Sequence, residues 1–429
     1  MNKRRVVITG LGLATALGLD VEGNWKNALE GFSGIERLTL PDSKNSAIQA
    51  AGQVKEKDWC TIQNEFPEEA SEEGERRTLF GLWAAKSALE EAGITPRNGN
   101  RERFGVFLAA GLGINRLEDI VRWIDREGKF NVLQFGKECH HVSRESIMKN
   151  NSHRPSTLIA TRYGLRGTNC TVTTACSSAT HALGIGYRAI VRGEADLVVA
   201  GGADSMINPV GLVFFVLLNA AALSSQSPGE ICRPFDRKRS GLVMGEGAGI
   251  AVLEEESHAQ KRGAKILAEV AGYGSSIDAY NVSAPHPQGC GAEQSMRMAL
   301  EDAGLNRDGI DYINAHGTGT KLNDVAETLA IKKVFKEKAY SIPVSSSKAL
   351  IGHLLAASGG PEFVYTVLSV KNDEIHPTIN LTNPDPKCDL DYVPLVKRTK
   401  RVRAALSNSF GFGGQNSSII VKKYNHGDH

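Results

Sequence analysis

Three residues combine a reactive side chain with a position at the end of a predicted strand: Cys176, His316 and His353. Cys176 lies in NCTVTTACSSATHALG, where a β-rich run meets a helix of small residues, and the dipole of such a helix stabilises a thiolate at its N-terminus. His316 follows an apolar strand in NAHGTGT, and His353 lies in the equivalent turn of SKALIGHLLAASGG. The alternatives are a buried structural cysteine and two histidines that complete the core.

The chemistry that a thiol and two imidazoles could share is definite. A thiolate accepts an acyl group, and two neutral imidazoles can donate hydrogen bonds that help to expel carbon dioxide from a second thioester and stabilise the enolate oxygen. One histidine at a strand end is more often a core residue. Two histidines and a cysteine at three such turns favour nucleophilic catalysis.

The elements that must position these residues form a repeating pattern. Apolar or β-branched runs predict strands, and two longer stretches, 77–93 and 177–192, predict helices. The predicted strands are 6–10, 105–111, 195–202 and 249–255 in the first part of the chain, and 266–274, 310–319, 342–347, 404–414 and 418–423 in the second. This predicts a duplicated α/β architecture with halves 1–260 and 261–429 and sheets covered by helices. The acidic stretch 65–75 and the polar stretch 125–154 are expected to be surface or interface loops.

Composition excludes several other classes of function. The chain has 429 residues, 41% hydrophobic and 23% charged, as in globular proteins, and its net charge of +2 is too small for a nucleic-acid partner. Its seven cysteines contain no C-x-x-C pair, which argues against disulfides and zinc and favours a reducing cytoplasm. No stretch approaches the ~20 apolar residues of a membrane span, so no membrane insertion is expected, and the run after Met1 is interpreted as a strand rather than a signal peptide.

No nucleotide or metal motif supports a bound cofactor. GLGLAT near the N-terminus is not a dinucleotide fingerprint, because Thr15 stands where G-x-G-x-x-G needs its third glycine. P-loop and H-E-x-x-H motifs are absent from the sequence. We therefore expect neither a cofactor nor a metal.

Taken in order, TACSS, RPFDRKRSGLVMGEGAG, NAHGTGT, SSSKALIGH and NSFGFGG resemble the elongating β-ketoacyl-acyl-carrier-protein synthases of the thiolase superfamily over nearly the whole chain. The resemblance implies a thiolase-like fold of two βαβαβαββ halves in five α-β-α-β-α layers. It also implies decarboxylative condensation of an acyl thioester with malonyl-acyl-carrier protein in fatty-acid elongation, with both substrates carried on phosphopantetheine.

The resemblance assigns roles to the catalytic candidates. Cys176 would be the acylated nucleophile, while His316 and His353 would serve decarboxylation and condensation. Lys348 would hold the site in its proper charge state, although a solvated surface lysine is the alternative.

Further positions match substrate-binding residues of the family. The backbone N–H groups of Cys176 and Phe412 would form an oxyanion hole, and the Phe412 ring would gate the acyl pocket. Thr318 and Thr320 would bind the phosphopantetheine amides, or merely cap a turn. Asp324 and Glu327 would support the second substrate's site, or form a D-x-x-E capping box.

The chain departs from the family pattern in three places. Ser240 stands where an acidic residue is common, Pro361 interrupts a helix that could kink or restart there, and the segment 129–154 is longer and more polar. Acyl length therefore stays open. Basic candidates for carrier-protein docking are Arg76, Arg77, Arg122, Arg126 and Lys129.

The resemblance leaves competing functions. The runner-up is the catalytic ketosynthase of a type II polyketide or polyene pathway, paired with a chain-length-factor-like homologue rather than a second copy of itself. Three other functions of related proteins are disfavoured. A non-catalytic partner subunit normally lacks the cysteine, and a degradative thiolase uses a second cysteine near the C-terminus. Initiating synthases typically have asparagine where His353 stands.

Overall fold

The computed structural model describes residues 4–40, 46–72, 76–95, 101–113, 121–142, 151–223 and 226–425. Within these ranges, ten strands form one hydrogen-bonded sheet in the order β10-β9-β13-β14-β8-β1-β7-β6-β4-β5. The strands are β1 Val6–Ala14, β4 Phe104–Ala110, β5 Asn169–Val172, β6 Leu197–Asp204, β7 Gly247–Glu255, β8 Ala268–Ile277, β9 Tyr312–Asn314, β10 Val344–Ser345, β13 Ala404–Gly411 and β14 Gln415–Lys422.

The order of strands repeats on either side of the junction between β1 and β8. In each half the first strand pairs antiparallel with the last, the last antiparallel with the fourth, and the fourth, second and third run parallel. A short antiparallel pairing, Val6 to Val270, Val7 to Glu269 and Ile8 to Ala268, joins the halves. The repeated topology supports the proposed division into residues 1–260 and 261–429.

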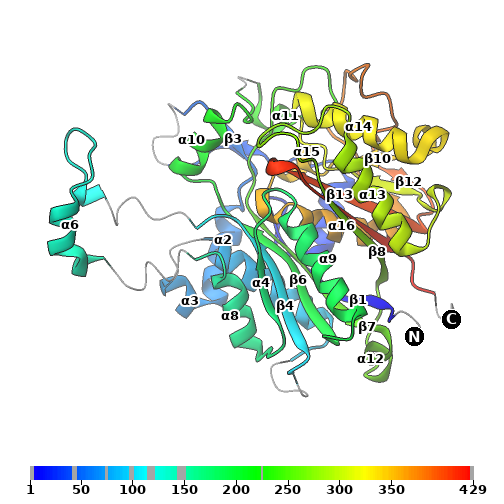
Figure 1. Cartoon of the computed structure of the whole chain (residues 1–429), viewed down its shortest axis with the longest axis horizontal. Coiled ribbons are helices and arrows are strands. Elements are labelled where there is room, and N and C mark those ends of the chain that lie inside the picture. The colour runs from blue at the N-terminus through cyan, green and yellow to red at the C-terminus, as the bar shows by residue number, and fades with distance from the viewer. Residues whose placement is uncertain are drawn as a thin grey trace.

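Helices form three layers around the two half-sheets (Figure 1). The outer layers are α4 (Arg76–Glu91) with α8 (Arg154–Tyr163), and α13 (Cys290–Ala303) with α14 (Lys321–Phe335). The central helices α9 (Ser178–Val191) and α16 (Gly359–Asn372) contact strands of both halves. They are rich in small and apolar residues and are buried nearly all round, as a helix between two sheets must be. Each half therefore runs β-α-β-α-β-α-β-β, as expected.

Shorter elements lie at the ends and edges of these layers. They are the helices α1 Val21–Leu29, α2 Glu56–Glu65, α3 Pro67–Glu72, α6 Val132–Glu138, α10 Pro209–Leu217, α11 Pro228–Ile231, α12 Glu256–Lys261 and α15 Lys348–Ile351, the two-residue strand pairs β2 Glu36–Arg37 with β3 Ala50–Ala51 and β11 Glu374–Ile375 with β12 Arg398–Thr399, and short 3-10 turns. In the described part of the chain, no helix is long and apolar enough to cross a membrane.

The expectation of loops was wrong in two places. Part of the acidic stretch forms α3, whose first residue is Pro67 and whose first turn carries Glu68 and Glu69, both favourable at a helix N-terminus. Part of the polar stretch forms α6, which projects from the body of the molecule in Figure 1. Residues 143–150 of that stretch lie outside the described residues.

The central helix α16 approaches the sheet closely at one point. An ideal Cβ at Gly249 in β7 would lie 2.2 Å from Pro361 N, and one at Gly360 would lie 2.3 Å from Gly249 O. Pro361 lies in the first turn of α16, where no intrahelical N–H bond is lost, so this proline restarts the helix and does not kink it. The contact fixes the distance between the two halves.

We expect Gly249→Ala to lower the free energy of unfolding by about 2 kcal/mol or more, because the added methyl group forces backbone apart between β7 and α16. The measurement is urea unfolding followed by circular dichroism. Gly136→Ala is the control, because nothing lies within 4 Å of its Cβ position. Equal unfolding midpoints for the two variants would contradict the close packing of the halves.

Candidate active site

A cavity of about 360 Å³ lies where the turns after β5, β9 and β10 meet, and Cys176, His316 and His353 line its wall. The structure thus brings together the three residues that the sequence singled out from different parts of the chain. Cys176 and His353 follow the equivalent third strands of the two halves, and His316 follows the second strand of the C-terminal half. Thr318, Thr320 and Phe412 line the same cavity.

The cysteine turn is built for a sharp change of direction between β5 and α9. Ala175 has a φ of +49°, which costs roughly 1–3 kcal/mol for a residue with a side chain. The Ser178 hydroxyl supports the turn by accepting from Thr174 N–H at 2.7 Å and donating to Ala175 O at 2.6 Å. An ideal Cβ at Gly411 would lie 3.0 Å from Cys176 N, so a glycine there lets the end of β13 reach the nucleophile.

Burial dominates the ionisation of the thiol. It raises the pKa of Cys176 to about 11, while the Lys348 cation and a hydrogen bond from the Phe412 backbone amide lower that pKa. The helix N-terminus alone therefore does not make a resting thiolate, because the group is almost fully enclosed. The thiol must lose its proton when it attacks.

The hydrogen bonds of His353 define its tautomer. Its Nδ1 accepts from Leu355 N–H at 3.0 Å and lies 2.7 Å from the Ser358 hydroxyl oxygen, so the ring proton is on Nε2. Nε2 is buried and has no partner within the described residues. Burial, with a smaller contribution from Lys348, holds the pKa of His353 well below its usual range. The ring is a neutral donor at the cavity wall.

His316 is held in the same state by Lys348. The Lys348 ammonium, which can only donate, lies 3.2 Å from His316 Nδ1, and this places the ring proton on Nε2. Burial first, then the positive charge of Lys348 and the neighbouring His353 ring, keep the pKa of His316 well below its usual range. The two rings meet edge to face with centroids 5.4 Å apart.

Lys348 is not a surface residue: its side chain is 1% exposed. Besides His316 Nδ1 it donates to His316 O and to Glu362, so all three ammonium protons are used. Glu362 is not among the residues that the sequence singled out, although its neighbour Pro361 is. Burial raises the pKa of Glu362 to about 7, and the Lys348 cation opposes that rise.

Glu327 and Asp324 bind backbone amides around His316. Glu327 accepts from the N–H groups of His316 and Gly317, both at 2.9 Å, and burial raises its pKa to about 7 against these bonds. Asp324 accepts from Gly319 N–H at 3.2 Å. The capping-box alternative was wrong, because α14 is capped by Thr320.

The structure confirms the capping role of the threonine pair, and binding of the phosphopantetheine amides stays a prediction. Thr320 caps α14 by accepting from Asn323 N–H at 3.3 Å, and its hydroxyl lies 2.9 Å from that of Thr318. The two residues also line the cavity beside the catalytic candidates. A cap that closes one wall of a cavity can serve structure and ligand alike.

Phe412 stands between the thiol and an apolar cluster. Its backbone amide lowers the pKa of the Cys176 thiol, and its partly buried ring packs on the cluster that includes Met206, Leu212 and Phe215. It begins the turn between β13 and β14, where Gly413 and Gly414 have φ of +78° and +73°. These are conformations that glycine adopts without strain.

One docking candidate fails in the structure. Arg77 is 1% exposed and donates to Gly111 O at 2.7 Å, so it cannot meet a partner at the surface. Arg76 is bound to Glu246 at 2.8 Å, whereas Arg122, Arg126 and Lys129 are exposed and stay predictions. Among the residues that the structure describes, no group of three His, Cys, Asp or Glu side chains could hold a metal ion.

Comparison with known proteins identifies relatives over the full length. Two family models match, "Beta-ketoacyl synthase, N-terminal domain" over residues 3–259 and "Beta-ketoacyl synthase, C-terminal domain" over residues 267–382. A 3-oxoacyl-[acyl-carrier-protein] synthase 2 of Synechocystis sp. is 39% identical over 426 residues, covering 99% of each chain.

Solved structures agree closely in fold. A ketosynthase solved with its type II polyketide acyl-carrier protein and bound to the hexaketide has a TM-score of 0.87 and 31% identity, covering 99% of this chain and 100% of that one. The ishigamide ketosynthase/chain length factor has a TM-score of 0.86 and 32% identity, with the same coverage.

We expect Lys348→Met and Glu362→Gln to change the reactivity of Cys176 in opposite directions. The Lys348 cation lowers the pKa of the thiol and the Glu362 carboxylate raises it. At pH ~8.5, alkylation of Cys176 by iodoacetamide should slow about threefold or more in Lys348→Met, since half a pKa unit changes the thiolate fraction about threefold, and should quicken in Glu362→Gln.

The rates are measured by mass spectrometry of the Cys176 peptide. Lys397→Met, which breaks a surface pair with Glu374 at 2.8 Å, should leave the rate unchanged. If Lys348→Met and Glu362→Gln both slowed alkylation, the reactivity of the thiol would depend on packing and not on charge.

Proposed function

The chain belongs to the β-ketoacyl synthase family, and we propose that it condenses an acyl thioester with malonyl-acyl-carrier protein, releasing carbon dioxide and giving β-ketoacyl-acyl-carrier protein in fatty-acid elongation. The family and the thiolase-like fold expected from the sequence are confirmed. One observation carries the mechanism: a buried thiol and two neutral Nε2–H imidazoles share a single cavity.

In the first half-reaction, the Cys176 sulfur attacks the carbonyl carbon of the acyl thioester. A new carbon–sulfur bond forms, the bond to the carrier's pantetheine sulfur breaks, and the pantetheine thiol leaves with the proton from Cys176. The backbone amides of Cys176 and Phe412 are the proposed donors to the carbonyl oxygen as it gains charge. The effect of the Phe412 amide on the pKa of the thiol supports this assignment, because a donor that lowers that pKa must lie close to the reacting atom.

In the second half-reaction, a malonyl thioester enters the same cavity. Its carbon–carbon bond to the carboxylate breaks, carbon dioxide leaves, and the electron pair becomes an enolate whose oxygen accepts from the Nε2–H groups of His316 and His353. The enolate carbon then attacks the acyl-Cys176 carbonyl, and the cysteine thiolate departs. Neutral imidazoles suit this role because they donate without carrying a proton that the enolate could remove easily.

The remaining roles follow from position. We assign Lys348 to maintaining the neutral His316 ring, Thr318 and Thr320 to the amides of the pantetheine arm, and Asp324 and Glu327 to supporting the loop that carries His316. Such a site needs no cofactor beyond the phosphopantetheine of its carrier protein. The cytoplasm is the proposed compartment.

A second candidate is the catalytic ketosynthase of a type II polyketide or polyene pathway. The polyketide ketosynthase and the ketosynthase/chain length factor with TM-scores of 0.87 and 0.86 favour it. The curated relative at 39% identity, a 3-oxoacyl-[acyl-carrier-protein] synthase 2, favours fatty-acid elongation. The acyl chain that the enzyme accepts separates these two functions.

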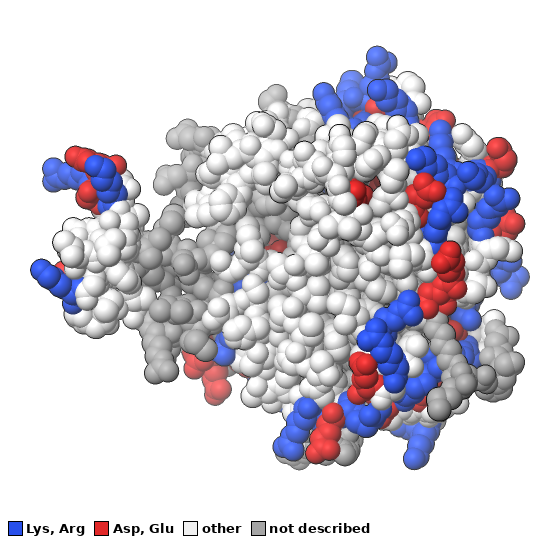
Figure 2. Space-filling model, in the orientation of Figure 1, with Lys and Arg blue, Asp and Glu red and all other residues white. Residues whose placement is uncertain are grey.

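Features of the molecular surface support the proposal that the chain pairs with a second subunit. β5 is an edge strand of the sheet, and the centre of the face in Figure 2, over α9, β4 and β6, shows few charged side chains. Lys and Arg gather instead towards the C-terminal half. A face with few charges beside an edge strand suits a homodimer, or a heterodimer with a homologous non-catalytic subunit.

We expect purified protein to gain one acyl mass on Cys176 when it is mixed with acyl-carrier-protein thioesters, and to release β-ketoacyl-carrier protein once malonyl-carrier protein is added. Cys176→Ala should give neither species, because no thiol accepts the acyl group. Intact-mass spectrometry over a panel of acyl chains measures both steps.

His316→Ala is the matched variant for the second step, expected to keep the acyl mass and to lose the condensed product. An unmodified Cys176 in the wild type, even with a co-purified homologue, would contradict the condensing function and favour a partner or scaffold role.

A further inference from the structure

Two loops from different halves form the mouth of the cavity. One is the start of α14, where Thr318, Thr320 and Lys321 line the cavity, and the other ends at Ser240 and Gly241. Arg239 immediately precedes Ser240 in the second of these loops, but its side chain points away from solvent and is 3% exposed. A buried arginine between two walls of a substrate channel requires an explanation, because burying its charge costs several kcal/mol unless its donors are paired.

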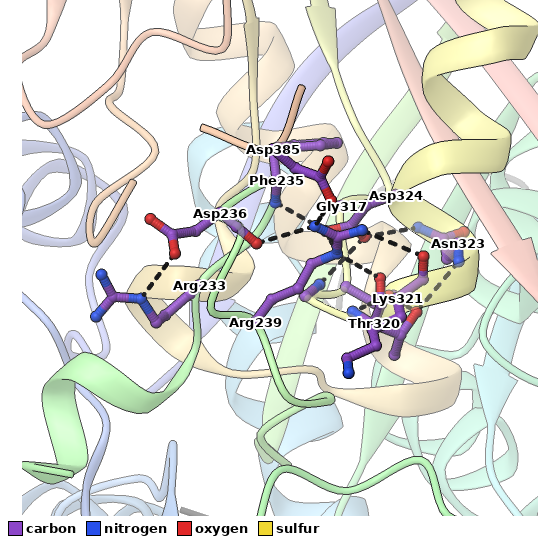
Figure 3. Close-up of polar contacts among 12 residues, drawn as sticks. Arg233, Phe235, Asp236, Arg239, Gly317, Thr320, Lys321, Asn323, Asp324 and Asp385 are labelled. Atoms are coloured by element: carbon purple, nitrogen blue, oxygen red, sulfur yellow. Dashed lines mark hydrogen bonds and ion pairs between the residues drawn. The ribbon is translucent and has the colours of Figure 1, made fainter. Parts of the chain in front are cut away.

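The Arg239 guanidinium binds both loops at once (Figure 3). Its Nε donates to Thr320 O at 3.0 Å and its Nη2 to Lys321 O at 3.2 Å, which fixes the two peptides that follow the threonine pair. Its Nη1 donates to Asp236 O at 2.9 Å and to Asp385 at 2.7 Å. The planar fork thus joins its own loop, the start of α14 and a third loop near residue 385.

A carboxylate extends the connection to the backbone of the threonine loop. Asp324 lies 3.6 Å from Arg239 Nε and accepts from Gly319 N–H at 3.2 Å and Phe235 N–H at 2.8 Å. Gly319 O in turn accepts from Gly241 N–H at 3.1 Å. The peptide groups on both sides of Thr320 are therefore held in place by Arg239 itself, by its neighbour Asp324 or by Gly241.

The loop that carries Arg239 is rigid enough to anchor the start of α14. Phe235 has a φ of +64°, a strained conformation for an aromatic residue, and its ring stacks on Tyr392 with centroids 3.8 Å apart. The same ring lies 3.1 Å from the position that a Cβ on Gly317 would occupy. The loop that carries Arg239 thus packs against the loop that carries His316 and cannot shift alone.

We propose that Arg239 is a positioning residue that sets the hydroxyls of Thr318 and Thr320 at the cavity mouth, where they receive the amide-bearing arm of the thioester substrate. The inference rests on the proposed function and deepens it, since it names what makes the site selective for pantetheine thioesters. Lysine cannot replace this arginine, because one ammonium group cannot span two carbonyls of α14, a third carbonyl and a carboxylate.

The test compares two thioesters of the acyl group that wild-type enzyme accepts fastest, the pantetheine thioester and the ethanethiol thioester, which has no amide. Acylation of Cys176 is followed by intact mass. In Arg239→Lys we expect the preference for pantetheine to fall about tenfold, a loss on the scale of one or two hydrogen bonds, while the ethanethiol rate stays within about twofold of wild type.

The control is Arg262→Lys, which disturbs another arginine paired with a buried carboxylate, Glu254 at 2.6 Å, near α12 and away from the cavity. The preference of the Arg262→Lys variant for the pantetheine thioester should equal that of wild type. In a Thr318→Ala, Thr320→Ala background, Arg239→Lys should have little further effect, because the hydroxyls through which it acts are gone.

An unchanged preference in Arg239→Lys, or an equal fall of both rates, would overturn the positioning role and leave Arg239 as a structural residue. A wild-type enzyme that neither thioester acylates would instead overturn the proposed function itself, and this inference with it.

Discussion

A single buried ammonium group, that of Lys348, acts on every reacting group in this cavity. Lys348 donates hydrogen bonds to His316 Nδ1, His316 O and Glu362, and it is buried so deeply that loss of the Glu362 carboxylate would leave an uncompensated charge. Its cation lowers the pKa values of Cys176, His316 and His353 together. Burial is the larger cause of the neutral state of the two rings, and the Lys348 cation adds to it while it also lowers the pKa of the buried thiol.

The Cys176 thiol lies beside these groups of the C-terminal half because the chain repeats its topology. The third strand of each half ends at the same cavity, so a cysteine from one half meets a histidine from the other, and α9 and α16 leave side by side between the sheets. The close approach requires small residues, as at Gly249 and Gly411, where a Cβ would collide with backbone. The site is a property of the interface between the halves.

Buried carboxylates here serve mainly to hold the backbone. Glu327 binds the amides that bracket His316, and Asp324 links the threonine loop to Arg239 and Phe235. Their raised pKa values reflect desolvation that these hydrogen bonds only partly offset. A strained turn at Ala175 and a strained Phe235 persist because the surrounding contacts leave them no alternative.

The sequence by itself determined the architecture and the reacting groups. Apolar runs ending in glycine located the long strands, and the motifs around Cys176, His316 and His353 indicated the family, because strand periodicity and strand-end chemistry are local properties. Only the tertiary structure decided the rest. That Lys348 is buried, that Glu362 completes its pairing, that Arg77 is enclosed and that Thr320, not Asp324, caps α14 all depend on contacts between segments distant in sequence. The burial of Arg239 could not be predicted from the sequence either, because an arginine in a loop is ordinarily solvated. It is buried here only because three loops converge on one guanidinium.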